Sequence, residues 1–445
     1  MNVIPLKAGF RPVHDAVREI NELAATQLLP ARKYHAAIAA TKRAIHVTPT
    51  SRELWTNLGS YYWNIQEYEE ARAALQRALC IDPDYAPACC NLALVMASMQ
   101  RHTDAERLFN RALEIDPDYL GCKWDRSLFR LARGDYEQGF AEYETRIPFR
   151  KQQGKRVYPE FEAPFWNGED LTGKSIYVAS EQGLGDTILF SRFLPWLAQQ
   201  AAQVYVCLSQ PMTSLLWEFR DLITLLPEGI PIPKTDYAMV MGSLPHRYGI
   251  TLETIPDDPG LILKRVQGYH ETSAIKLPAP EGPNPLRIGL CWTGNPEQDR
   301  NDERSIPFEL MLGLVANPQV WGYSLQVGAG EADVYRAGAK QLINDLGPEL
   351  RGRGLTAAGA VMLDLDLVIT CCTSIAHLAG ALGVPCWVVL CSDPYWLWLQ
   401  GRSDSLWYPS LRLFQQPEPG DWRSVMAEVQ SELNRLLEQR ILRHG

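Results

Sequence analysis

Residues 175–195 read SIYVASEQGLGDTILFSRFLP, and this stretch decides the fold of the longer part of the chain. The apolar run SIYVAS is typical of a buried strand. It leads into a loop with Gly183 and Gly185, and a helical pattern begins near Asp186. A strand followed by a short loop and a helix is the opening unit of a parallel sheet. The stretch therefore predicts an α/β fold, with its first loop at the carboxyl end of a strand.

The same alternation continues through the rest of the sequence. Five more apolar runs are separated by helical stretches, which implies strands joined by crossover helices. The proline-rich segment KLPAPEGPNPLR divides this region near residue 282 into two α/β halves, and a last helix is expected from Asp421 to about Arg440. The expected strands are QVYVCLS (203–209), YAMVMG (237–242), LRIGLCW (286–292), DLVIT (366–370) and CWVVLC (386–391).

Upstream of this region the sequence is repetitive. Pro49, Pro83 and Pro117 lie in the similar segments HVTPTS, CIDPDY and EIDPDY, at intervals of 34 residues. Small residues recur where the two helices of a hairpin would cross, and proline stops the second helix. The repeating unit is therefore an antiparallel helix pair. Its recurring positions are Trp55, Leu58, Gly59, Tyr62, Ala71 and Ala78, then Ala105, Phe109 and Ala112, and in an earlier unit Ala37 and Ala44.

This period and pattern resemble the tetratricopeptide (TPR) repeat. The resemblance covers about the first third of the chain and includes a degenerate unit from Gly134 to about Phe149. Such arrays usually receive an extended segment of another protein on their concave face, so a protein or peptide partner is expected, with a spacer or dimerisation arm as the alternative. The predicted organisation is a TPR array of about four hairpins over 1–150, a linker over 151–173 packed through Trp166, and α/β domains over 174–282 and 283–445.

Composition narrows the classes of partner. The 445 residues are 46% hydrophobic and 21% charged, which is ordinary globular usage for several packing units. A net charge of −9 gives no overall attraction to nucleic acid or to an anionic membrane. The sequence shows no signal-peptide pattern, no run of about 18 apolar residues, and no CxxC pair among its ten cysteines. We expect a cytoplasmic protein with reduced thiols and no integral membrane segment.

One phosphate-binding motif occurs in the wrong context. Residues 168–175, GEDLTGKS, match the Walker A pattern letter for letter. A P-loop must follow a strand and open a helix, so that its amides surround the phosphate. This segment instead precedes the strand SIYVAS, so we do not expect a nucleoside triphosphatase.

The loop after that strand is the first candidate for chemistry. It contains Gln182, Gly183 and Gly185, and its glycines permit tight backbone conformations and close approach. Asp186 has two interpretations. It is either the N-cap of the next helix or a carboxylate that accepts a proton from an attacking hydroxyl. Because a helix N-terminus weakens a carboxylate as a base, the second interpretation needs a partly desolvated site.

A second candidate loop follows DLVIT. Thr373 or Ser374 can cap the next helix, whose free amides suit a diphosphate at the carboxyl edge of a parallel sheet. His377 lies in the first turn of that helix. It either donates a hydrogen bond to a phosphoryl oxygen or is simply hydrogen-bonded against the helix.

A third candidate opens the second α/β half. The segment GLCWTGNP contains Gly294 and Asn295, and Arg300 and Arg304 follow it. Backbone amides and guanidinium groups suit phosphate or sugar hydroxyls, although solvated surface arginines are more common. This loop and the loop after DLVIT together predict the side of the molecule that binds an anionic donor.

Together these segments resemble the bacterial family in which a TPR array precedes a domain similar to ADP-heptose:lipopolysaccharide heptosyltransferases (glycosyltransferase family 9-like). The resemblance implies a GT-B fold, in which two Rossmann-like domains face each other, one for the acceptor and one for the nucleotide-sugar donor. It matches Asp186 to the general base and the turn from Ser374 to His377 to the donor-phosphate region. No metal is expected, and a nucleotide diphospho-sugar is the only co-substrate. The matching segments are SEQGLGDTILFSRFLP, GLCWTGNP with RSIPF, LDLVITCCTSIAHLAGALGVP and SLWYPSLRLFQQPEPGDW.

The sequence departs from the family pattern on the donor side. Cys372 stands where an acid is usual in VDTSVAH, and Tyr395 and Leu397 replace an acid and an arginine of PDWRW. Gln298 stands where a histidine often follows GNP. The resemblance implies a metal-independent, inverting glycosyltransferase whose acceptor is recruited by the array. The alternative is a catalytically degenerate scaffold that retains the fold and binds proteins.

Overall fold

The structure is a computed structural model that describes residues 33–154, 162–181, 183–273, 275–279, 285–298 and 300–444. These residues form two compact units. The first contains residues 33–130 and 141–154, and the second contains 131–140 and the described residues from 162 onward. Gln182, residues 155–161 of the predicted linker and 280–284 of the proline-rich segment lie outside the described residues.

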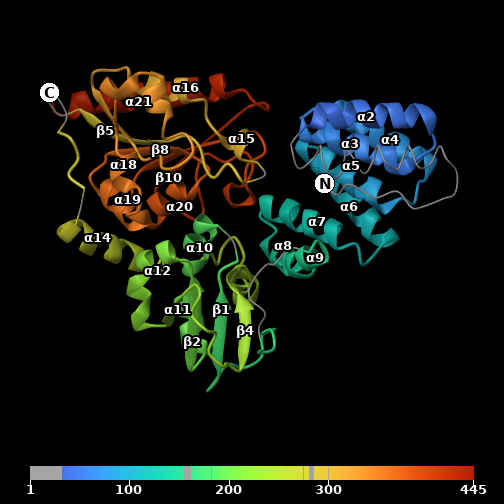
Figure 1. Cartoon of the computed structure of the whole chain (residues 1–445), viewed down its shortest axis with the longest axis horizontal. Coiled ribbons are helices and arrows are strands. Elements are labelled where there is room, and N and C mark those ends of the chain that lie inside the picture. The colour runs from blue at the N-terminus through green and yellow to red at the C-terminus, as the bar shows by residue number, and fades with distance from the viewer. Residues whose placement is uncertain are drawn as a thin grey trace. The chain divides into compact units, whose positions relative to one another are not determined.

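The first unit consists of helices arranged in antiparallel pairs (Figure 1). Each repeat proline lies two residues beyond the end of a helix: Pro49 beyond α2, Pro83 beyond α4 and Pro117 beyond α6. Proline lacks an amide hydrogen and disfavours helical geometry in the residue before it, so these helices end where the period predicts. The helices of this part of the chain are α2 (Tyr34–Val47), α3 (Arg52–Asn64), α4 (Tyr68–Ile81), α5 (Ala86–Ser98), α6 (His102–Ile115), α7 (Leu120–Ala132), α8 (Tyr136–Tyr143) and α9 (Arg146–Gln152). The end of α7 and most of α8 lie in residues 131–140, which belong to the second unit.

Small residues lie at the crossings of these paired helices, as the repeat pattern predicts. A Cβ atom on Gly59 of α3 would lie 2.5 Å from Cγ of Leu75 on α4, so a larger residue would push the two helices apart. Ala71 and Ala78 on α4 are fully buried. Close helix approach and large neighbouring side chains together give each hairpin a dense apolar interior.

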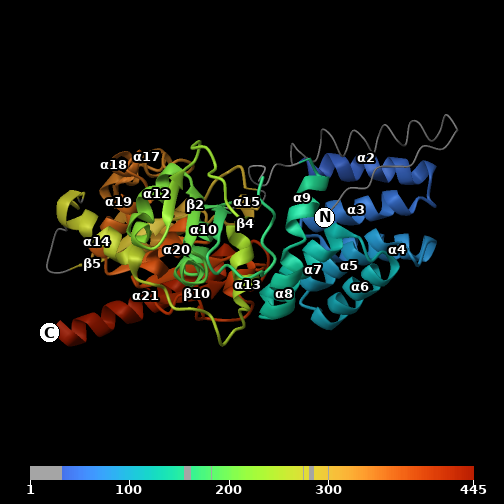
Figure 2. The same ribbon diagram turned by 90° about the horizontal axis from the view of Figure 1, so that it is seen from below.

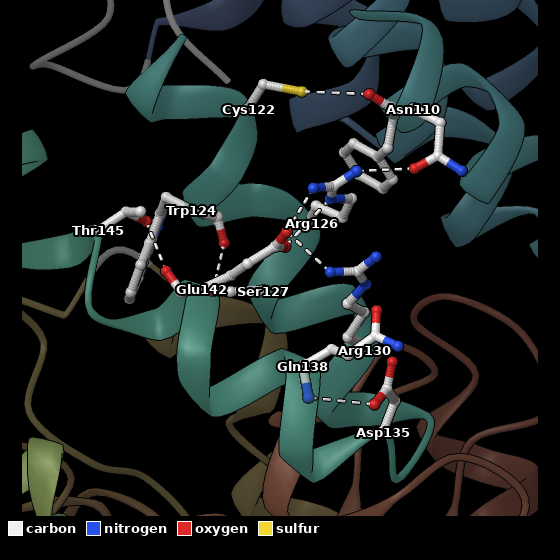
Figure 3. A network of polar contacts seen from close by, with 11 residues as sticks. Asn110, Cys122, Trp124, Arg126, Ser127, Arg130, Asp135, Gln138, Glu142 and Thr145 are labelled. Carbon is white, nitrogen blue, oxygen red and sulfur yellow. Dashed lines mark hydrogen bonds and ion pairs between the residues drawn. The ribbon is translucent and has the colours of Figure 1, made fainter. Parts of the chain in front are cut away.

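The array continues beyond Pro117 through charged side chains (Figure 3). Glu142 on α8 accepts hydrogen bonds from Arg126 and Arg130 on α7, the latter at 2.7 Å. Arg126 also donates to the side-chain oxygen of Asn110 on α6 at 2.7 Å. Partly shielded ion pairs therefore join α7 to α8, and a hydrogen bond joins α7 to α6 of the preceding repeat.

Two parallel sheets form most of the second unit, as predicted. Their strand orders are β3-β2-β1-β4 and β10-β9-β8-β5-β6-β7. The chain therefore changes direction at β1 in the first sheet and at β5 in the second. Such reversal points are where ligands bind in open α/β sheets. The strands are β1 (Ser175–Ala179), β2 (Gln203–Leu208), β3 (Thr224–Pro227), β4 (Tyr237–Val240), β5 (Leu286–Cys291), β6 (Val320–Ser324), β7 (Ile343–Asp345), β8 (Leu367–Cys371), β9 (Cys386–Leu390) and β10 (Leu411–Gln415).

The helices of the second unit connect these strands. The last helix, α21, has an N-terminal cap in which Asp421 accepts from the amide of Ser424 at 3.0 Å, close to the predicted start. No helix in the described ranges is long and apolar enough to cross a membrane. The helices are α10 (Leu184–Ser191), α11 (Leu194–Gln200), α12 (Gln210–Leu215), α13 (Leu244–Tyr248), α14 (Leu261–Ser273), α15 (Asn301–Arg304), α16 (Phe308–Val315), α17 (Asp333–Arg336), α18 (Gly347–Leu350), α19 (Gly354–Leu363), α20 (Ser374–Ala381) and α21 (Trp422–His444).

The described end of the predicted linker belongs to the first sheet. Phe165 forms a parallel bridge with Ala238 of β4, and the amide of Trp166 donates to the carbonyl of Ala238 at 2.8 Å. Trp166 is buried, as predicted. The Walker-like residues 168–175 run directly into β1 and open no helix, so the context that excludes a P-loop is confirmed.

Candidate functional site

Two helices that follow strands of different sheets pack against each other. Helix α10 follows β1 and α20 follows β8, and both Figure 1 and Figure 2 show the two helices side by side. At their contact, a Cβ atom on Gly185 would lie 2.7 Å from Cδ2 of His377. This separation is too short for two carbons, so glycine is required at position 185. The missing side chain lets the loops after β1 and β8 meet.

Asp186 is the third residue of α10 and does not cap it. The N-cap residue is Gly183, so the interpretation of Asp186 as the N-cap residue is wrong. Its Oδ1 instead accepts a hydrogen bond from the hydroxyl of Tyr395 at 2.9 Å. Both side chains are half-buried. The carboxylate is therefore partly desolvated, which the general-base interpretation requires.

His377 lies beneath this contact. Only 4% of its surface is exposed, and its Nδ1 is 3.1 Å from the hydroxyl oxygen of Tyr408. Burial, together with the positive charges of Arg192 and Arg304, lowers the pKa of His377 to about 3. The ring is therefore neutral at pH 7. These contacts match the interpretation of a histidine hydrogen-bonded against the helix, because its Nδ1 contacts Tyr408 and little of the ring is exposed.

Helix α20 begins as predicted at the end of β8. Thr373 is its N-cap, and the Thr373 side chain accepts a hydrogen bond from the amide of Ile375 at 3.3 Å. Ser374 is the first helical residue and is half-buried. The first amides of a helix point outward and carry partial positive charge, which favours an anion at this end.

Arg304 adds a full positive charge beside this helix start. Its Nη1 donates to the carbonyl of Cys372 at 3.0 Å, and its Nε and Nη2 each lie 3.2 Å from Oδ1 of Asn301. Within the described ranges, no carboxylate lies within ion-pair distance of this guanidinium. Arg300 differs, because Glu303 and Asp393 pair with it at 2.7 and 3.2 Å. Arg304 is thus the better placed of the two arginines to bind an anionic ligand.

The backbone amides of the loop after β5 donate to protein side chains. This corrects the prediction that these amides bind phosphate or sugar hydroxyls. The amide of Gly294 donates to Asn301 Oδ1 at 3.1 Å, and Gln326 Oε1 accepts from the amides of Trp292 and Thr293. Those amides are therefore occupied by protein groups. A Cβ atom on Gly294 would lie 2.4 Å from Nη2 of Arg304, so this glycine makes room for the guanidinium.

The exposed end of the same loop forms a turn. Asn295 is exposed, and its Oδ1 accepts from the amide of Glu297 at 3.0 Å. Gln298 is also exposed. Both side chains therefore lie toward solvent.

Three of the four departures from the family pattern gather around the contact between α10 and α20. Tyr395 donates to Asp186, and Trp398 Nε1 donates to Sγ of Cys372 at 3.1 Å. Leu397 lies between these two aromatic residues in the chain and is buried. The sequence could flag these positions as unusual, but it contained no signal that Tyr395 contacts Asp186.

Comparison with known proteins assigns part of the helical region. Residues 66–121 match the tetratricopeptide repeat family. The chain is also 26% identical over 342 residues to the protein FlbA of Caulobacter vibrioides. This match covers 69% of this chain and 54% of FlbA. The chain therefore spans about half the length of this curated relative.

Two solved structures are similar to different extents of the chain. An O-GlcNAc transferase mutant from Thermobaculum terrenum is 14% identical, with 97% of this chain and 94% of that chain covered and a TM-score of 0.33. The crystal structure of MamA is 25% identical, with 32% of this chain and 81% of that chain covered and a TM-score of 0.26. The tetratricopeptide repeat match itself includes α4, α5 and α6.

Proposed function

We propose that this protein is a glycosyltransferase that moves a sugar from a nucleotide diphospho-sugar to an acceptor hydroxyl. The observation that carries the proposal is the contact between α10 and α20. It joins a partly desolvated carboxylate, Asp186, to a helix start beside the cation Arg304. A base and an anion-binding group are the two requirements for displacing a diphosphate from a sugar. The two sheets would then be the paired domains of a GT-B fold, similar to heptosyltransferases.

In the proposed reaction, Asp186 accepts the proton of the acceptor hydroxyl while the oxygen attacks the anomeric carbon. The new bond forms as the bond between that carbon and the diphosphate oxygen breaks, so the configuration inverts. The diphosphate carries the electron pair away and binds the amides of α20, the Ser374 hydroxyl and Arg304. Thr373 would hold the helix start, and Asn295 would contact the exposed part of the donor. No metal is assigned to any step.

The helical array is proposed to recruit the acceptor. Stacked helix pairs present an extended surface that suits a peptide or a protein carrying the acceptor hydroxyl. The acceptor would then be a protein or a glycan attached to one, and we place the reaction in the cytoplasm. This part rests on the tetratricopeptide repeat match over residues 66–121.

Ligand binding tests the donor site. Titration calorimetry and thermal shift would compare UDP, GDP, CDP and ADP, with phosphate-free nucleosides as the reference. At a hundred times its dissociation constant, a ligand that binds only the folded protein adds about 2.7 kcal/mol of stability. We expect Arg304→Gln to weaken binding of the preferred diphosphate about tenfold or more, since one charge-assisted contact is removed.

Arg336→Gln is the matched control for this test, because Arg336 is an exposed arginine of the same half, on α17. It should bind the diphosphate as tightly as the wild type. If no nucleoside diphosphate binds, or if both arginine variants bind equally well, the donor site is not at α20.

The second candidate function is the degenerate scaffold. It is favoured by the substitution of Cys372 for an acid and by the Trp398 side chain that covers its sulfur. A scaffold could retain diphosphate binding but would not turn over a donor. Donor turnover therefore separates the two functions.

A further inference from the structure

We propose that Arg300, Glu303 and Asp393 bind the sugar of the donor and select a neutral, hydroxyl-rich sugar over one that carries a carboxylate. This inference rests on the proposed function and names the class of sugar that would be transferred. The three side chains form an acid–arginine cluster at the carboxyl edge of the second sheet. They are open to a ligand, because the side chains of Arg300, Glu303 and Asp393 are 42, 32 and 30% exposed.

The strand order places this cluster beside the start of α20. Strands β9, β8 and β5 are neighbours in a parallel sheet, so the loops at their carboxyl ends lie next to one another. Asp393 follows β9, whereas Arg300 follows β5. Nη2 of Arg300 lies 3.2 Å from Oδ2 of Asp393 and donates to the Asp393 carbonyl at 2.9 Å. This contact therefore spans the carboxyl end of β8, where α20 begins.

The cluster also lies close to the proposed base. Tyr395, two residues after Asp393, donates to Oδ1 of Asp186 at 2.9 Å. Burial raises the pKa of the Cys372 thiol, and to a smaller extent Asp186 raises it and Arg300 lowers it, so both charged groups lie near this sulfur. A sugar whose diphosphate binds at the start of α20 would therefore lie between the cluster and Asp186.

The hydrogen-bonding groups of the cluster match those of neighbouring sugar hydroxyls. A hydroxyl donates one hydrogen bond and accepts others, so it can bind between a carboxylate and a guanidinium. Nε of Arg300 donates to Oε2 of Glu303 at 2.8 Å. In the described part of the chain, Oε1 of Glu303 and Oδ1 of Asp393 accept no hydrogen bond, and Nη1 of Arg300 donates none. Two acceptors and one donor are therefore left for the hydroxyls of a ligand.

The charge of the cluster determines the class of sugar. Glu303 and Asp393 carry two negative charges against one positive charge on Arg300, so the three side chains are negative overall. A sugar carboxylate placed beside them would be repelled, and it would lose hydration without gaining an unpaired cation, since Arg300 is already paired. Neutral hydroxyls avoid both effects. Arg304, which pairs with no carboxylate in the described ranges, remains for the diphosphate.

Binding of matched donors tests the inference without turnover. For whichever of UDP, GDP, CDP and ADP binds best, titration calorimetry compares the diphosphate alone, its glucose and mannose esters, and the two uronate esters in which C6 of the sugar is oxidised. We expect the wild type to bind at least one neutral ester about tenfold or more tightly than the matching uronate, because like charges meet only in the uronate complex. Equal affinities within both pairs would overturn the inference.

Asp393→Asn separates the sugar from the rest of the donor. It should weaken binding of the neutral ester about tenfold, because a charged acceptor of a hydroxyl is lost, and it should leave binding of the diphosphate alone unchanged. The preference for the neutral ester over the uronate should shrink accordingly. Asp404→Asn is the matched control, because Asp404 also pairs with an arginine, Arg402 at 2.6 Å, and its side chain is 61% exposed. It should bind all the ligands as the wild type does.

The outcomes distinguish this inference from the proposed function. If Asp393→Asn weakens the diphosphate alone as much as the sugar ester, the cluster contacts the nucleotide and the inference is wrong. Glu303→Gln, with the same expected pattern, replaces Asp393→Asn if that variant does not fold. If the wild type binds diphosphates but both variants bind the neutral ester as tightly as the wild type, only the inference fails. If no diphosphate binds, the proposed function fails and the inference fails with it.

Discussion

His377 shows that a histidine in a position suited to ligand binding can instead be buried in the protein. The sequence places a histidine in the first turn of a helix that is suited to phosphate, where a proton donor would be useful. The structure instead encloses the ring, with its Nδ1 against the Tyr408 hydroxyl. Burial depends on residues far away in the chain, and the local sequence could not reveal it. The result is a neutral histidine that fills the contact between α10 and α20.

This burial predicts a pH dependence of stability. Burial lowers the pKa of His377 to about 3, whereas an unfolded histidine has a pKa of about 6.5, so between these values the unfolded chain binds a proton that the folded chain does not. The free energy of unfolding should therefore fall as the pH falls from 6.5 toward 3, by about 2 kcal/mol at pH 5 from this group alone. The measurement is denaturant unfolding of the wild type and of His377→Asn at pH 7 and pH 5.

The variant lacks the titrating ring, so its loss between pH 7 and pH 5 should be smaller than that of the wild type by about this amount. Parallel losses in the two proteins would show that His377 is protonated in the folded state, contrary to its buried position.

Helices α10 and α20 meet only because position 185 has no side chain. We expect Gly185→Ala to lower the free energy of unfolding by about 1–3 kcal/mol, since the added carbon would lie 2.7 Å from Cδ2 of His377. Gly313→Ala on α16 is the control, because nothing lies within 4 Å of a Cβ atom there. An alanine at this exposed helix position should stabilise the protein by about 0.5–1 kcal/mol. Denaturant unfolding of both variants gives the comparison, and a neutral Gly185→Ala would refute the close approach.

The regular elements were largely predictable from local patterns. Gly59 and Pro83 are examples, because a 34-residue period places a small residue at each helix crossing and a proline after each second helix. The six strands expected from apolar runs are all present. Four strands were missed: β3 and β7 contain only 4 and 3 residues, too few to show a period, and β6 and β10 contain 5 residues each but were not recognised in the runs VWGYS and LRLFQ.

Contacts between residues far apart in the chain could not be predicted from the sequence. Tyr395 and Asp186 are 209 residues apart, and their hydrogen bond exists only because both α/β halves pack as they do. Gln326 was missed for a related reason, since it occupies the amides of the loop after β5 from the end of a different strand. The predicted phosphate contacts of that loop therefore had to be revised, while those of the α20 start remain proposals.

At the level of the whole chain, a helical array is combined with two parallel sheets that bring three separate loops together. The array offers a surface for a partner, and the sheets bring a carboxylate close to a helix start. Each part has a separate proposed role, so damage to one should spare the other. On the proposed function, changes in the array should alter which acceptor is used without altering donor binding.

Donor turnover is the measurement that tests the account most directly. Release of nucleoside diphosphate from UDP-, GDP-, CDP- and ADP-sugars would be followed for the wild type and Asp186→Asn, with donor affinity measured for both proteins. The account predicts that the wild type releases diphosphate from at least one donor. It also predicts that Asp186→Asn binds this donor equally well but has a turnover rate lower by about a hundredfold or more. Equal rates in the two proteins, or a wild type that binds donors and never turns them over, would contradict it.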